Sequence, residues 1–243
     1  MGRALYLARA LYLAYGAVVV AAVMVTLWLA MLFVRRPRTA IALQSAASRL
    51  MLAGLGCRFV VRGAWPARDG AARLFVANHT SYLDIPLMLA VMNRDFCFVT
   101  KRELLDWPII SLITRAGAHI PVARERVESR GAVVARIIKT LRAGRSVLVF
   151  PEGTFSHDDG LRPFQPGAFR AALTAGVPVV PVALNGVARV WSPHERAPRP
   201  GVIDVWVGEA LTIAEGDDVA RTEALAAAAV RFIEQHGRPT PRA

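Results

Sequence analysis

Hydrophobic positions follow three patterns along this chain. Residues 10–34 carry no charge and are almost entirely apolar, and a helix of roughly 25 residues is long enough to cross a hydrocarbon core of about 30 Å. Residues 39–55 mix apolar and polar positions, which predicts a second helix that lies on the bilayer face or dips into it. From Phe59 onward, short apolar runs alternate with longer helical stretches. The chain therefore begins with membrane-associated helices and continues as a folded body.

The alternation in the body predicts an α/β fold, with a mostly parallel or mixed sheet of about seven strands flanked by helices. The expected strands are Phe59–Val61, Leu74–Ala77, Phe96–Thr100, His119–Ala123, Ser146–Phe150, Val177–Leu184 and Val202–Val207. The expected helices lie near Ile85–Asn93, Trp107–Ala116, Val127–Ala143, Ala168–Ala175 and Val219–His236. We divide the chain into membrane-anchoring helices in residues 1–56, an α/β domain in 57–236 and a flexible tail in 237–243.

Composition and charge support a membrane surface as the partner. Hydrophobic residues make up 54% of the chain, the mean hydropathy is +0.38 and the net charge is +12, a combination that favours an anionic lipid leaflet over nucleic acid. Basic residues are denser after the apolar run than before it: Arg35, Arg36 and Arg38 against Arg3 and Arg9. The positive-inside rule then places the residues after 35 in the cytoplasm, and we expect the inner (cytoplasmic) membrane with the α/β domain on its cytoplasmic face. Whether the first helix spans the bilayer, or the two helices form a re-entrant hairpin that never crosses it, stays open.

A histidine and an aspartate lie just after one of the expected buried strands. His79 follows Leu74–Ala77, and Asp84 comes five residues later. Histidine exchanges protons near neutral pH, and a nearby carboxylate can orient its ring and stabilise its charged form. Because positions five apart on one helix lie about 140° apart, His79 must precede the next helix and Asp84 must lie in its first turn. The alternative is an ordinary N-cap aspartate beside a structural histidine.

A second polar segment follows the strand expected at residues 146–150. It reads Pro151-Glu152-Gly153-Thr154-Phe155-Ser156. A strand that runs into such a turn presents N–H groups and hydroxyls at the carboxyl edge of the sheet, where ligands bind in open α/β folds. A buried Glu152 requires a cation or hydrogen-bond donors. Taken alone, the segment is also compatible with a plain turn.

The two segments together resemble two sequence blocks of the glycerolipid acyltransferases, specifically the 1-acylglycerol-3-phosphate (lysophosphatidic acid) acyltransferases. Residues 78–84 are similar to the family's His-x-x-x-x-Asp block, and residues 150–154 to its Phe-Pro-Glu-Gly-Thr block. Residues 101–124 and 179–182 resemble two further blocks, and all four appear in the family's order. The resemblance implies a membrane-bound O-acyltransferase. Such an enzyme moves a fatty acyl group from acyl-CoA or acyl carrier protein to 1-acylglycerol-3-phosphate, giving phosphatidic acid.

The resemblance also implies roles for individual residues. His79 is the expected general base, Asp84 orients it, and the expected substrate-binding residues are Lys101, Arg124, Glu152, Gly153, Thr154 and Arg162. The chain departs from the family at Phe155, where an arginine associated with the acceptor's phosphate is usual, and at Ala123, where an acid is common. The positive charge must then come from Lys101, Arg124 or Arg162, or the acceptor has a different headgroup.

The sequence leaves alternatives to this activity. One is an acyltransferase for another lyso-lipid, such as lyso-ornithine lipid or a lysophospholipid; a less favoured one is a non-catalytic membrane protein that binds anionic lipid. Cys57 and Cys97 have no basic neighbour that would mark a nucleophile, and the histidines lack metal-ligand spacing. We therefore expect no metal and no cofactor besides the acyl donor. The expected partners are membrane lipid, the lyso-lipid acceptor and acyl-CoA or acyl carrier protein.

Overall fold

The computed structural model describes residues 2–92, 95–122, 127–155, 160–195, 197–213 and 215–237. Two helices open the chain, α1 (Gly2–Met31) and α2 (Pro37–Gly54). The strands are β1 (Cys57–Arg62), β2 (Leu74–Ala77), β3 (Phe96–Lys101), β4 (Ile120–Val122), β5 (Ser146–Val149), β6 (Val179–Asn185) and β7 (Gly201–Val207). The other helices are α3 (Asp84–Met92), η1 (Arg102–Asp106), α4 (Pro108–Ala116), α5 (Val127–Arg142), α6 (Gly167–Ala175), α7 (Val187–Val190) and α8 (Asp218–His236).

The strands form one seven-stranded sheet in the order β1-β7-β6-β2-β5-β3-β4. Neighbouring strands are parallel except β6 and β7, which run antiparallel. Leu74 in β2 lies opposite Val147 in β5 and Val179 in β6. The predicted fold class, a mostly parallel sheet of about seven strands flanked by helices, is confirmed. Because β2, β5 and β3 are parallel, their carboxyl ends meet at one edge, and the predicted site residues follow those ends.

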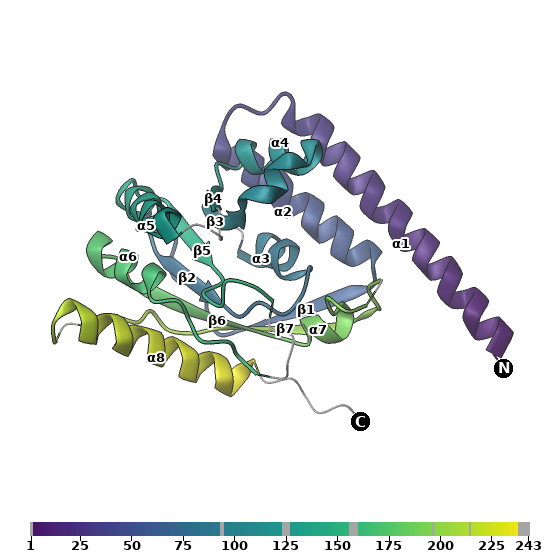
Figure 1. The fold of residues 1–243 in the computed structure, drawn as a ribbon. Helices are drawn as coiled ribbons and strands as arrows, with labels where there is room; N and C mark the ends of the chain where they lie inside the picture. Colours follow the sequence, from purple (N-terminus) through teal and green to yellow (C-terminus); the bar gives the residue numbers. More distant parts are fainter. Residues whose placement is uncertain are drawn as a thin grey trace.

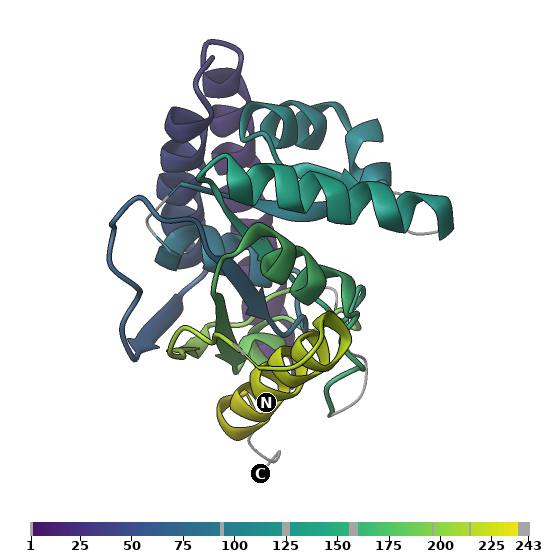
Figure 2. The ribbon, with the colours of Figure 1, turned by 90° about the vertical axis from the view of Figure 1, so that its left-hand side faces the viewer.

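Helices cover both faces of the sheet (Figure 1). All four residues of β2 are buried, as expected for a parallel strand covered on both sides. Phe75 and Ala77 belong to the core beneath α2 and α3, whereas Leu74 and Val76 belong to the core shared with α5, α6 and α8. Figure 2 shows the same layers from the side. The period-two alternation of side chains along the strand therefore fills two separate cores.

The second helix packs against the protein with a partly polar face. Its buried residues include Gln44, Ser45 and Ser48, whereas Leu50 is 64% exposed and Leu43 also faces outward. Gln44 Nε2 donates to a backbone carbonyl at the end of α4, 3.0 Å away. Polar side chains thus dock α2 on the domain and leave leucines available for lipid.

The first helix is the most apolar element of the described chain. Residues Tyr6–Met31 have a mean hydropathy of 2.2 with 17% of the window buried, and among the described helices this one alone is long and apolar enough to cross a membrane. Its second half packs on α2 and α4 through Leu27 and Met31, and its N-terminal end extends beyond the body (Figure 1). The helix marks the chain as membrane-associated; the domain boundary at residues 56 and 57 stays a prediction.

Most expected elements are present, with several differences at their ends. The strand expected at His119–Ala123 is the shorter β4, because His119 precedes it and Ala123 lies outside the described residues. The apolar run continues to Val34, but α1 ends at Met31. The short helices η1 and α7 were not predicted, since a helix of one turn has no periodicity to detect. The predicted tail lies outside the described residues beyond Gly237.

Candidate active site

The site is built where the chain turns from β2 into α3. His79 lies in the connecting bend and Asp84 is the first residue of the helix, which is the arrangement that the five-residue spacing requires. The His79 Nδ1 and Asp84 Oδ2 atoms are 2.9 Å apart. The same carboxylate oxygen accepts the backbone N–H groups of Thr80, at 2.6 Å, and Ser81, at 2.8 Å. The carboxylate therefore fixes the imidazole and the bend that carries it.

This geometry defines which imidazole nitrogen is available for chemistry. An ionised carboxylate only accepts hydrogen bonds, so the ring nitrogen that faces Asp84 must be the donor. We therefore assign the hydrogen to Nδ1, which leaves a lone pair on Nε2. Nε2 has no hydrogen-bond partner among the described residues, and the His79 side chain is 10% exposed while that of Asp84 is fully buried. An N-cap side chain accepts from N–H groups that follow it, but Thr80 and Ser81 precede Asp84. The contacts therefore favour an oriented base over the N-cap alternative.

Glu152 joins the second segment to His79. Its Oε1 atom accepts the backbone N–H of His79 at 2.7 Å, and its Oε2 atom accepts that of Arg162 at 3.1 Å. Only 5% of the residue is exposed, and burial raises the pKa of this carboxyl group. The hydrogen-bond donors expected for a buried Glu152 are thus two backbone N–H groups. Through one of them the Glu152 carboxylate holds the backbone of His79 in place.

The turn that carries Glu152 depends on glycine. Gly153 has a φ of +75°, in the left-handed region that favours glycine, and its N–H donates to the Phe150 carbonyl at 3.1 Å. Thr154 follows at an intermediate level of exposure. This tight turn brings the end of β5 back beside the bend after β2.

Asn78 supports the site and was not among the predicted site residues. Its Oδ1 atom accepts the Leu184 N–H at 2.7 Å, and its Nδ2 atom donates to the Leu184 carbonyl at 2.9 Å. The side chain thereby continues the hydrogen bonding between β2 and β6 past Ala77, where the β2 ladder ends. A buried polar residue directly after an apolar strand is the sequence signal that could have revealed it.

Aromatic rings surround the imidazole. The ring centroids of Phe150 and Phe155 lie 4.3 Å and 4.2 Å from that of His79. Phe155 also contacts Tyr82 at 4.9 Å, and Tyr82 contacts Trp191 at 5.6 Å. The departure from the family pattern at position 155 therefore lies directly on the predicted base.

Lys101 and Arg162, two of the three predicted cations, are exposed in the described part of the structure. Lys101 is exposed at the end of β3, two strands from β2 and thus about 10 Å away by ordinary strand spacing. Arg162 is exposed as well, and its backbone N–H is held by Glu152. Arg124 lies outside the described residues. That these cations bind substrate stays a prediction.

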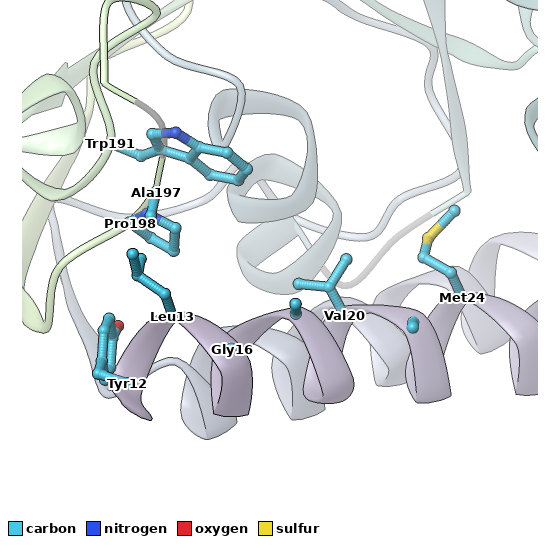
Figure 3. A pocket seen from close by; sticks show the side chains of 10 residues that line it. Tyr12, Leu13, Gly16, Val20, Met24, Trp191, Ala197 and Pro198 are labelled. Atoms are coloured by element: carbon cyan, nitrogen blue, oxygen red, sulfur yellow. The ribbon is translucent and has the colours of Figure 1, made fainter. Parts of the chain in front are cut away.

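An apolar cavity of about 440 Å³ lies between α1 and the segment that follows α7. Figure 3 shows Leu13 and Val20 of α1 extending toward Trp191 and Pro198. Trp191 also touches Tyr82 in the ring cluster. One tryptophan is therefore shared by the cavity and the surroundings of His79.

Neither cysteine is suited to hold an acyl group. Cys57 and Cys97 are buried free thiols, and burial raises the pKa of each to about 11, which disfavours the nucleophilic thiolate. Within the described ranges, no group of His, Cys, Asp and Glu side chains is arranged to hold a metal ion. That the reaction needs neither metal nor cofactor stays a prediction.

Comparison with known proteins identifies the family. A family model described as "Acyltransferase" matches residues 58–185, just over half of the chain. The chain therefore belongs to the acyltransferase family, as the two sequence blocks predicted.

Individual relatives support this assignment. The chain is 35% identical over 117 residues to the chloroplastic 1-acyl-sn-glycerol-3-phosphate acyltransferase BAT2 of Brassica napus, covering 48% of this chain and 34% of that one. It is 36% identical over 132 residues to the lyso-ornithine lipid O-acyltransferase of Pseudomonas aeruginosa, covering 54% and 50%. The chain thus spans half or less of the length of these relatives.

A solved structure has the same fold. The 1-acyl-sn-glycerophosphate acyltransferase PlsC from Thermotoga maritima aligns with a TM-score of 0.75 and 21% identity, covering 95% of this chain and 96% of that one. The aligned region includes the N-terminal helices as well as the sheet, since almost all of the chain is covered.

Proposed function

We propose that this protein is a membrane-bound O-acyltransferase that transfers a fatty acyl group from a thioester to the free hydroxyl of 1-acylglycerol-3-phosphate, giving phosphatidic acid. The observation that carries the proposal is the 2.9 Å contact between His79 Nδ1 and the buried Asp84 carboxylate, on a chain of the acyltransferase family. Relatives named as 1-acyl-sn-glycerol-3-phosphate acyltransferases in Brassica napus and in human support this acceptor.

The site geometry supports a direct transfer. His79 Nε2 accepts the proton of the acceptor hydroxyl as that oxygen attacks the thioester carbonyl carbon. Asp84 then faces a positively charged imidazolium and stabilises it, as the acid of a triad does. Collapse of the tetrahedral intermediate breaks the carbon–sulfur bond, and the departing thiolate recovers the proton from His79. General-base assistance of this kind typically contributes about 10²–10⁴-fold to a rate.

The surroundings provide places for both ends of a lysophospholipid. The apolar cavity beside Trp191 suits an acyl chain that reaches out of the bilayer along α1. Lys101 and Arg162 are exposed near the sheet edge, and we assign them to the anionic headgroup, together with Arg124. We assign Gly153 and Thr154, in the turn beside His79, to the same headgroup. The acceptor would then enter from the membrane while the thioester donor approaches from water.

The membrane arrangement follows from α1 and α2. Arg35, Arg36 and Arg38 lie in the connection after α1 and in the first turn of α2, and this placement favours the cytoplasmic face of the inner membrane. The leucines that α2 directs away from the protein add apolar contact on the same side. We infer that acyl-CoA or acyl carrier protein delivers the thioester from that side.

Two observations favour a second acceptor. Phe155 occupies the position where the family usually has a cation, and the chain is also similar to a lyso-ornithine lipid O-acyltransferase. The purified full chain in mixed vesicles should be given lysophosphatidic acid, lyso-ornithine lipid or lysophosphatidylcholine, each with acyl-CoA and with acyl carrier protein, and the products identified by mass spectrometry. We expect phosphatidic acid to form fastest. Faster acylation of lyso-ornithine lipid would replace the proposed acceptor, and no transfer to any of them would refute the function.

A further inference from the structure

The ring of Phe155 lies on the imidazole of His79. The two ring centroids are 4.2 Å apart with an angle of 41° between the planes, and Phe150 stacks on the same imidazole at 4.3 Å and 20°. One face of an imidazole has no room for two phenyl rings at these distances. The two phenylalanines therefore contact His79 from different sides.

Hydrogen bonds hold only two points of His79. Asp84 fixes Nδ1 and Glu152 fixes the backbone N–H. Neither contact prevents the ring from tilting about the line that joins Nδ1 to the Asp84 carboxylate. Phe150 restrains one side from the end of β5. Phe155 supplies restraint on the other side, and the edge of Tyr82, 4.9 Å away, keeps the Phe155 ring in place.

We propose that Phe155 is a positioning residue that completes an aromatic clamp around His79 and holds Nε2 in the orientation needed to accept the hydroxyl proton. The proposal rests on the proposed acyl transfer for its kinetic consequence, whereas the clamp itself is a property of the folded protein. A phenyl ring at this position carries no charge, so it cannot pair with an anionic headgroup.

The kinetic test uses the purified full chain with lysophosphatidic acid and acyl-CoA. Phe155→Leu removes the ring, Phe155→Tyr keeps it, and Phe59→Leu removes a half-buried phenyl from β1 at the far edge of the sheet. Aromatic contacts of this kind change an equilibrium constant by up to about tenfold. We expect F155L to lower kcat about three- to tenfold with both KM values within about twofold of wild type, and F155Y and F59L to stay near wild type.

A chemical test does not depend on turnover. Diethyl pyrocarbonate modifies unprotonated imidazoles, and the peptide containing His79 can be followed by mass spectrometry. We expect F155L to speed modification of His79 several-fold and F155Y to leave it unchanged. Phe155→Met serves as the second ring-less variant if F155L does not fold.

The two readouts separate the clamp from the enzymatic activity. An unchanged modification rate or an unchanged kcat in the ring-less variant would overturn the role of Phe155. A larger KM for the acceptor with constant kcat would also overturn it, because Phe155 would then be a substrate contact. If wild type acylates no lyso-lipid, the proposed function fails, and the modification rates still decide whether Phe155 covers His79.

Discussion

Replacing Asp84 with asparagine should remove a charge from the site while keeping its geometry. The N–H groups of Thr80 and Ser81 both point at Oδ2, so they select the amide oxygen for that position. The amide nitrogen then takes the Oδ1 position, which is buried and has no hydrogen-bond partner among the described residues. The His79 Nδ1 hydrogen bond, and with it the tautomer, is expected to survive.

The expected loss follows from the distance between the charges. The 2.9 Å contact places an imidazolium and the carboxylate about 4 Å apart, where opposite charges attract by about 4 kcal/mol at an effective dielectric constant near 20. The dipole of the asparagine amide keeps part of this attraction. The remaining loss of transition-state stabilisation should lower kcat of Asp84→Asn by about 10²–10³-fold. The stranded amide N–H groups should lower the free energy of unfolding by about 1–3 kcal/mol.

The assay compares kcat and KM for lysophosphatidic acid at saturating acyl-CoA, with urea unfolding in the same detergent. Asp204→Asn is the matched control, since that carboxylate, on β7, forms an ion pair with Arg62 on the edge strand β1, away from His79 in the sheet order. It should leave kcat unchanged. A D84N enzyme within about tenfold of wild type would refute the role of the Asp84 charge.

Three further changes test the supports of the site and the docking of α2. Asn78→Ala leaves the N–H and carbonyl of a β6 residue unpaired, and we expect a loss of about 2–4 kcal/mol in urea unfolding. Glu152→Ala strands the buried N–H of His79 and should lower both kcat and the free energy of unfolding, whereas Glu152→Gln, which keeps one acceptor, should be milder. His119 is buried beneath α2, and this burial lowers its pKa to about 3. The unfolded chain binds that proton near pH 6.5 and the native chain does not, so stability should fall as the pH drops from about 6.5 toward 3, by up to about 1.4 kcal/mol per pH unit. Denaturation of wild type and His119→Gln between about pH 4.5 and 7 measures this slope.

Each of these predictions has a result that would contradict it. Equal stability of Asn78→Ala and wild type would mean that the bridge to β6 contributes nothing. A Glu152→Ala enzyme with normal kcat would show that His79 is positioned without Glu152. An unchanged pH slope in His119→Gln would mean that another group causes the loss of stability in acid.

Local sequence patterns predicted the strands and the bend between His79 and Asp84. The β2 residues are apolar and bounded by polar ones, and the five-residue spacing excludes a common helix. The direction of β7 was not predictable in the same way, because β6 and β7 are each apolar and nothing local sets their relative orientation. The burial of Gln44 in α2 was also not predicted, because its partner His119, with which it forms a 3.0 Å hydrogen bond, is 75 positions away.

The parts of the site that escaped prediction depend on contacts between distant segments. Glu152 and His79 are 73 positions apart, and Asn78 and Leu184 are 106 apart. Phe155 could be recognised from the sequence only as a departure from a motif. Its contact with His79 requires the turn at Gly153 to fold back over the bend after β2, which is a property of the assembled sheet edge.

The central claim is that the imidazole of His79 removes a proton from a lipid hydroxyl. The most direct measurement is single-turnover acyl transfer by His79→Gln, with lysophosphatidic acid and acyl-CoA, beside binding of the same variant to anionic vesicles. We predict that transfer falls by at least about 10²-fold while vesicle binding and the unfolding midpoint stay near wild type. Transfer at the wild-type rate by this variant would contradict the account.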